Sequence, residues 1–153
     1  MLKLYQSCIL STPLYASECW RMTKDDLERE SVFHTKSLRG ILRISWLNKI
    51  SSEELLRRCE QESMTNILMK RKWRWIGHVL RRDKDDNARI ALYLTPEGKR
   101  KRGRPKTTWR RIVMEELRAI GETWDSIGRK AQDRQEWRSF VAARLHPRGH
   151  HGQ

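Results

Sequence analysis

Apolar residues recur at helical spacing along most of this chain. The two clearest runs are Trp109, Ile112, Val113, Leu117 and Ile120, and then Trp137, Phe140, Val141 and Leu145. Both follow an i, i+3, i+4 and i+8 pattern, which predicts amphipathic helices that pack by similar faces. The period-2 alternation typical of strands is absent from the sequence. The pattern therefore predicts an all-α fold, an irregular bundle of about six to seven helices.

Helix-start signals divide the chain. Thr23, Ser51 and Thr123 each precede a helical apolar pattern, and Asp133 precedes the last one. Hydroxyl or carboxylate side chains at such positions accept hydrogen bonds from free backbone N–H groups. We expect helices over about 23–44 and 51–59, and two more from residues 123 and 133. The inward residues expected in the first are Leu27, Phe33, Leu38, Ile41 and Leu42.

A third long helix is expected over about 64–82. Its apolar face would carry Met64, Leu68, Trp75, Ile76 and Val79, and its opposite face Lys70, Arg74, Gly77 and Arg81, with His78 at the border. A basic outer stripe favours a helix that lies along a phosphate backbone. Trp73 falls off the apolar face and is the candidate for base stacking. Gly77 permits either close approach of a backbone or close helix packing.

Residues 98–111 form the most basic segment. Eight of these fourteen residues are cationic: Lys99, Arg100, Lys101, Arg102, Arg104, Lys106, Arg110 and Arg111. Gly103 and Pro105 oppose a regular helix, so an extended basic loop is expected over 98–107. Thr107 or Thr108 then caps a helix that begins near Trp109. Because basic side chains and helix N-termini both attract anions, this segment predicts a phosphate-binding site, with Gly103 allowing close approach.

The net charge strengthens that interpretation. The 153 residues carry a net charge of +14, and residues 70–111 hold sixteen Lys and Arg against four acids, or +12 of that total. Such a concentration of like charge opposes folding unless a polyanion neutralises it. Nucleic acid, either RNA or DNA, is therefore the expected partner, ahead of a membrane. No apolar run approaches the ~18 residues that cross a bilayer.

Residues for catalysis or metal binding are not arranged in a recognisable pattern. Cys8, Cys19 and Cys59 are odd in number and lack CxxC spacing, and His150 and His151 lie in a Gly-rich tail. The adjacent carboxylates Asp25–Asp26 and Asp85–Asp86 lie at a helix start and in a charged turn, where acids are common, whereas metal-dependent nucleotidyl transfer needs carboxylates fixed on a rigid backbone. We predict no enzyme activity, no metal, no cofactor and no small-molecule substrate.

One short motif offers a different function. Arg102-Gly103-Arg104-Pro105 matches the core of an AT-hook, an arm that lies in the minor groove of A·T-rich DNA. Glycine lets the backbone sink into the groove while the arginines follow its negative potential. The surrounding KRKRGRPK also suits a nuclear import receptor. A DNA-binding regulatory protein is therefore the alternative interpretation.

Five blocks of the sequence resemble a known family. They are LYASECW (14–20), LRGILRISW (38–46), RKWRWIGHVLRRD (71–83), TPEGKRKRGRPKTTWRR (95–111) and AQDRQEWRSFVAA (131–143). Together they resemble the C-terminal region of non-LTR (LINE-type) retrotransposon reverse transcriptases, over roughly residues 2–145. In such proteins an endonuclease and a polymerase lie upstream. The polymerase's aromatic-x-Asp-Asp turn and the zinc knuckle of several relatives are both missing from this sequence.

The resemblance implies a domain organisation. Residues 1–22 would be the end of a polymerase thumb, residues 23–145 a helical basic module with its loop at 95–108, and residues 146–153 a disordered tail. It also accounts for the apolar residues 2–20, which have no obvious partner within the sequence and suggest that an upstream segment is missing.

The interpretation that follows is a non-catalytic, nucleic-acid-binding C-terminal fragment that contacts the phosphate backbone of template RNA or target DNA. An upstream polymerase domain would be its partner if one is encoded. Its expected location is the nucleus. The further alternative is an inert translated retrotransposon remnant, which would be cytoplasmic.

Overall fold

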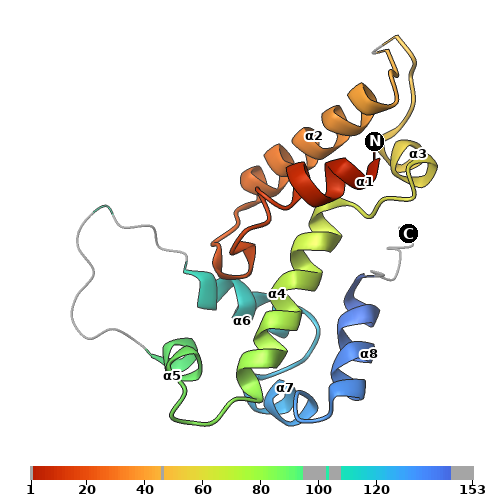
Figure 1. Ribbon diagram of the computed structural model, residues 1–153. Helices are drawn as coiled ribbons and strands as arrows, with labels where there is room; N and C mark the ends of the chain where they lie inside the picture. Colours follow the sequence, from red (N-terminus) through yellow and green to blue (C-terminus); the bar gives the residue numbers. More distant parts are fainter. Residues whose placement is uncertain (1, 46, 95–102, 104–107, 146–153) are drawn as a thin grey trace, which may run out of the picture. The chain divides into compact units, whose positions relative to one another are not determined.

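The computed structural model describes residues 2–45, 47–94, 103 and 108–145, and every regular element in this part of the chain is helical (Figure 1). The α-helices are α1 (Leu2–Leu4), α2 (Lys24–Ile41), α3 (Ser52–Arg58), α4 (Met64–Leu80), α5 (Asn87–Tyr93), α6 (Trp109–Ala119), α7 (Trp124–Lys130) and α8 (Arg134–Leu145). A π-helical segment η1 (Tyr5–Leu10) continues α1, and a 3₁₀ turn η2 (Ser17–Cys19) precedes α2. The all-α prediction is confirmed, with eight α-helices in the described residues where about six to seven were expected.

The predicted helix starts are confirmed by their hydrogen bonds. The side chains of Thr23, Ser51, Thr108 and Thr123 each accept from a backbone N–H three residues later. Asp133 Oδ1 accepts from the N–H of Gln135 at 2.6 Å. One helix end differs from the prediction. The helix α2 ends at Ile41 instead of near Ile44, because Arg43 adopts a left-handed φ of +53°.

The chain divides into two compact units. The first unit is Met1–Arg71 and the second is Lys72–Gln153, so the boundary falls within α4. The sequence interpretation drew a boundary at residue 22, and that division stays a prediction. The origin of residues 1–22 in a polymerase thumb stays a prediction, and the tail 146–153 lies outside the described residues.

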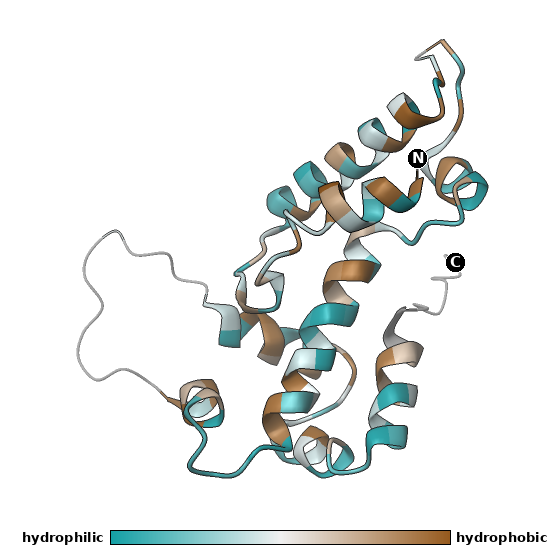
Figure 2. Ribbon diagram, viewed as in Figure 1, coloured by the Kyte–Doolittle hydropathy of each residue, from teal (hydrophilic) through white to brown (hydrophobic). Residues whose placement is uncertain are grey.

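The first unit has a largely aliphatic core. Its buried residues are Tyr5, Leu10, Leu14, Leu38, Leu55, Cys59, Met64 and Leu68. Thus the N-terminal apolar segment, expected to lack a partner within the chain, packs against residues of α2, α3 and the start of α4. Hydrophobic and hydrophilic positions alternate around α2 and α4, as amphipathic helices require (Figure 2).

A polar pair lies inside this core. His34 is 1% exposed, and its Nδ1 accepts a hydrogen bond from the Tyr5 hydroxyl at 2.8 Å while its Nε2–H donates to the backbone oxygen of Glu62 at 3.2 Å. Phe33, predicted to face inward, is 40% exposed instead. Adjacent helix positions point about 100° apart, and on α2 the direction that faces the core is that of His34. The histidine takes that place because both of its ring nitrogens find partners.

The second unit has an aromatic core. Trp73 and Trp137 are 1% and 3% exposed, and their ring centroids are 6.3 Å apart. Phe140 contacts both rings, at 5.8 Å from Trp73 and 5.1 Å from Trp137. Ile76, Val79, Leu80, Val113, Leu117, Ile127 and Val141 are also buried in this unit. Since large rings bury much apolar area each, a few aromatic side chains can hold α4 and α8 together.

Candidate nucleic-acid interface

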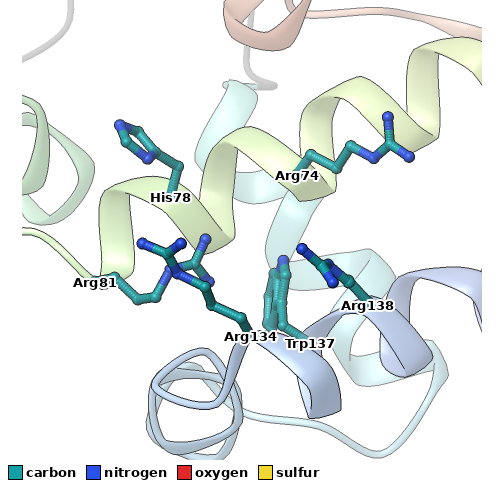
Figure 3. A pocket seen from close by; sticks show the side chains of 6 residues that line it. All are labelled: Arg74, His78, Arg81, Arg134, Trp137 and Arg138. Carbon is teal, nitrogen blue, oxygen red and sulfur yellow. The ribbon is translucent and has the colours of Figure 1, made fainter.

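The second unit carries an open pocket of about 530 Å³ with a cationic lining. Its lining residues are Arg74 and His78 of α4, Arg81 in the turn that follows α4, and Arg134, Trp137 and Arg138 of α8 (Figure 3). Among the described residues, no acidic side chain lines this pocket. Guanidinium groups donate hydrogen bonds and accept none. The pocket is therefore chemically suited to an anion.

Helical spacing brings these side chains together. Arg74 and His78 lie four residues apart on one face of α4, and Arg81 follows directly after the last residue of that helix. On α8, Arg134 and Arg138 are four residues apart and flank the turn that carries Trp137. Each helix thus presents a short basic ridge, and the pocket lies between the two ridges.

A close contact between Trp137 and Gly77 fixes the two helices. The Trp137 Nε1–H donates to the backbone oxygen of Trp73 at 3.1 Å. A Cβ placed on Gly77 would lie 2.0 Å from Trp137 Nε1, so no larger residue fits there without displacing the indole. Gly77 was predicted to lie in the exposed basic stripe, but it is buried. Of the two roles considered for it, the structure supports close helix packing.

Arg81 is the anchored member of the cluster. Its Nη1 donates to the backbone oxygen of Ala131 at 2.9 Å. Burial lowers the pKa of the Arg81 guanidinium, and the positive charge of Arg134 lowers it further. An arginine nevertheless stays protonated at any ordinary pH. The two charges therefore repel each other, and an anion between them would relieve that repulsion.

The other pocket arginines have no acidic partner in the described part of the chain. Neither an ion pair nor a hydrogen bond connects Arg74, Arg134 or Arg138 to another described residue. The acids of this unit pair elsewhere: Glu116 with Lys72 at 2.5 Å, Asp86 with Arg82 at 2.6 Å, and Glu122 with Lys130. His78 Nε2 accepts from Arg82 Nε at 3.2 Å, which leaves its Nδ1–H as a donor.

The predicted stripe on α4 is only partly reproduced. Arg74 is exposed and Arg81 is half-buried, and both line the pocket. Lys70 belongs to the first unit, where it pairs with Glu62 at 2.6 Å. A residue already neutralised by a carboxylate is a poorer phosphate ligand.

The prediction that Trp73 stacks on a base is wrong. Its side chain is 1% exposed and lies in the aromatic core of the second unit. Trp75, which was assigned to the core, is half-buried and meets the edge of Trp109 at 5.7 Å. Positions 73 and 75 are about 200° apart around a helix, so reversing one reverses the other.

Most of the predicted loop site lies outside the described residues. This holds for Lys99, Arg100, Lys101, Arg102, Arg104 and Lys106. Gly103 is described: it is exposed, has a left-handed φ of +86° and has no atom within 4 Å of an added Cβ. Arg110 is half-buried and donates through Nη1 to the backbone oxygen of Tyr93 at 2.8 Å, while Arg111 is exposed on α6.

Two pocket residues, Arg134 and Arg138, were missed by the sequence analysis. Their spacing of four residues around Trp137 was readable as a basic ridge on the last helix. The link to α4 was not readable, because Trp137 and Trp73 are 64 residues apart in sequence.

The described residues contain neither a candidate metal site nor a helix that could span a membrane. Within residues 2–45, 47–94, 103 and 108–145, no three or more His, Cys, Asp or Glu side chains are grouped so that they could hold a metal ion. In the same residues, each helix is too short or too polar to cross a bilayer.

Comparison with known proteins gives one relative. The chain is 28% identical over 149 residues to an uncharacterized transposon-derived protein of Caenorhabditis elegans, a match that covers 90% of this chain. The chain spans about half of that relative's length, 52%. No protein-family model and no solved structure matches the chain. Thus the chain is similar to a transposon-derived protein.

Proposed function

We propose that this chain is a non-catalytic, nucleic-acid-binding C-terminal region of a non-LTR retrotransposon reverse transcriptase. It would contact the phosphate backbone of template RNA or target DNA. The observation that carries the proposal is the uneven charge of the two units. The first unit has twelve Lys and Arg against nine Asp and Glu, a net charge of +3, and the second has twenty-one against ten, a net charge of +11.

Charge of this density favours a polyanion over a small ligand. A polynucleotide presents many phosphates along one surface, and binding releases the counterions condensed on it. A free anion offers no such gain. Excess positive charge in one compact unit therefore supports nucleic acid as the partner.

The retrotransposon part of the proposal rests on sequence. The five blocks that resemble the non-LTR C-terminal region span most of the chain, and the relative in Caenorhabditis elegans is described as transposon-derived. Since that relative is about twice as long, an upstream polymerase domain is a consistent partner. We propose a nuclear location on the same basis, because the parent enzymes act on genomic DNA.

The test is a salt titration of binding. If about 6–8 phosphates are neutralised, affinity for short RNA or DNA should fall by roughly 10³–10⁴-fold between 50 and 200 mM salt. The measurement is fluorescence anisotropy with the whole chain and a labelled oligonucleotide. A flat salt response, or no binding at low salt, would reject the nucleic-acid function and leave the inert remnant.

The AT-hook alternative is tested in the same titration. An AT-hook protein would prefer A·T-rich duplex to G·C-rich duplex, since it reads the narrow minor groove. A backbone-binding protein would bind both alike. A strong A·T preference would therefore replace our proposal with the regulatory one.

A further inference from the structure

We infer that the pocket between α4 and α8 is a clamp for the phosphodiester backbone, which grips the strand without reading its bases. This inference rests on the proposed function and assigns part of that binding to Arg74, Arg134 and Arg138. The latter two arginines lie outside the basic segment that the sequence singled out.

The first argument is the state of the arginines. Arg74, Arg134 and Arg138 make no ion pair within the described residues, and Arg134 faces the positive charge of Arg81. Other basic residues of the unit, such as Lys72 and Lys130, do have carboxylate partners. Unpaired guanidinium groups therefore line one open pocket, in which those of Arg81 and Arg134 lie close together and that of Arg138 lies beside Trp137 (Figure 3). Planar guanidinium groups bind phosphate oxygens through paired hydrogen bonds.

The second argument is rigidity. The Trp137 indole closes the base of the clamp and is held by its hydrogen bond to the Trp73 backbone and by the two neighbouring rings. Arg134 and Arg138 flank this fixed residue on α8, and Arg74 lies one turn before Gly77 on α4. Basic side chains on regular helices, packed around the buried Trp137 indole, lose less conformational freedom on binding than basic side chains on a flexible segment.

The third argument concerns bases. Stacking would need an accessible aromatic face, but Trp137 is 3% exposed and both its ring contacts and its Nε1–H are already used. Apart from this indole, the lining consists of arginines and one histidine. It includes no amide or carboxylate side chain of the kind that reads adenine or cytosine. Arginine can also bond guanine, so equal binding of A·T-rich and G·C-rich duplexes is the result that identifies backbone contacts, which position a strand without specifying sequence.

The experiment compares two double variants of the whole chain. Arg134→Gln with Arg138→Gln removes two charges from the pocket. Arg118→Gln with Arg129→Gln removes two exposed charges from the same unit, on α6 and α7, and serves as the matched control. Both are titrated with RNA and with A·T-rich and G·C-rich DNA duplexes, and both are checked for folding by thermal melting.

The pocket variant should bind about 10–100-fold more weakly at 0.1 M salt, and its log–log salt slope should be smaller by about two. The control should change the slope by much less. The loss should be the same for both duplexes. Arg74→Gln alone, on the other helix, should lower the slope by about one, and this variant keeps the test valid if the double variant misfolds.

Three results would overturn the clamp. Equal effects of the two double variants would mean that only net charge matters. A loss confined to one base composition would mean base readout. The third result is saturable competition at constant ionic strength. Competition by inorganic phosphate would mean a site for a free anion, and competition by an acidic peptide alone would mean a site for an acidic protein segment. In all three cases the wild-type protein still binds nucleic acid with a steep salt dependence, so the proposed function survives. Failure of the proposed function would instead appear as a flat salt titration of the wild-type protein.

Discussion

The two units differ in net charge and in where their unpaired arginines gather. In the first unit, with a net charge of +3, Glu54 pairs with both Arg57 and Arg58 at 2.8 Å, and Arg71 pairs with Glu18 at 3.1 Å. The second unit, with a net charge of +11, also has ion pairs, but Arg74, Arg134 and Arg138 line one pocket without an acidic partner in the described residues. Excess positive charge is thus gathered at one site in the second unit.

The cores differ in a matching way. The first is mostly aliphatic, with the single polar pair of Tyr5 and His34. The second is built on Trp73, Trp137 and Phe140. Like charges held near one another destabilise a fold, so a unit that gathers arginines needs strong apolar packing beneath them. Stability and binding should therefore respond to different residues of the second unit.

The largest effect on stability should come from its aromatic core. Trp73→Ala should lower the free energy of unfolding by about 3–5 kcal/mol, because it empties a fully buried site. Trp75→Ala should cost only about 1–2 kcal/mol, since that ring is half-buried against Trp109. Denaturant titration of the two variants measures both. A larger loss of stability for Trp75→Ala than for Trp73→Ala would support the buried face of α4 that the sequence predicted, with Trp75 inward.

Gly77→Ala should have the next largest effect. Its methyl group would overlap the Trp137 indole, which is confined by two other rings, and overpacking of this kind costs about 1–3 kcal/mol. Gly40→Ala is the control in the first unit. Gly40 lies in α2 with no atom within 4 Å of an added Cβ, so alanine there should stabilise by about 0.5–1 kcal/mol. Stabilisation by both substitutions would disprove the close packing of the Trp137 indole against Gly77.

A pH titration probes the polar pair of the first unit. Burial lowers the pKa of His34 below its usual value, so the folded protein keeps this ring neutral. The unfolded chain binds a proton below about pH 6.5, and stability should therefore fall by up to about 1.4 kcal/mol per pH unit as the pH drops below that value. Denaturant midpoints at several pH values measure this slope.

The matched variants are His34→Gln and His78→Gln. His34→Gln should be less stable at neutral pH but should lose the acid sensitivity, whereas His78→Gln, at an exposed position, should keep it. An acid sensitivity that survives in His34→Gln would show that another group controls the pH dependence.

Local signals were sufficient for the helices. A cap such as Thr23 or Thr123 acts within three residues, so the sequence alone identifies where the helices after these caps begin, whereas α5 was not predicted. The same holds for the apolar stripe of α6, in which Val113 and Leu117 are buried as predicted. The extended loop expected over 98–107 stays a prediction, because all of that segment except Gly103 lies outside the described residues.

Long-range packing was not predictable in the same way. The sequence pattern predicted one buried stripe along α4. Met64 and Leu68 are instead buried in the core of the first unit, and Trp73 and Leu80 are buried in the core of the second. A helix shared by two cores has no single apolar face. The pocket depends on the same information, since it forms only where the Trp137 indole meets Gly77.

The smallest effect is expected at Gly103, within the basic segment 98–111 of the second unit. An arm inserted in a minor groove needs glycine, because a Cβ would meet the groove wall, whereas an arm that contacts phosphates tolerates a methyl group. The φ of +86° disfavours alanine locally, but Gly103 is exposed with no neighbour within 4 Å, so the strain can relax without disturbing the core. Binding by the folded pocket should not depend on this residue.

We therefore expect Gly103→Ala to change nucleic-acid affinity less than about twofold, with A·T-rich and G·C-rich duplexes bound alike. The fold gives the reason: α6 begins at Trp109, capped by Thr108, only four residues after Pro105. A basic segment tethered so closely to a helix cannot extend deeply into a groove as a flexible arm does. Anisotropy titrations of Gly103→Ala and wild type with both duplexes measure the difference. Loss of a clear A·T preference on substitution would transfer binding from the folded arginine pocket to an AT-hook in the loop.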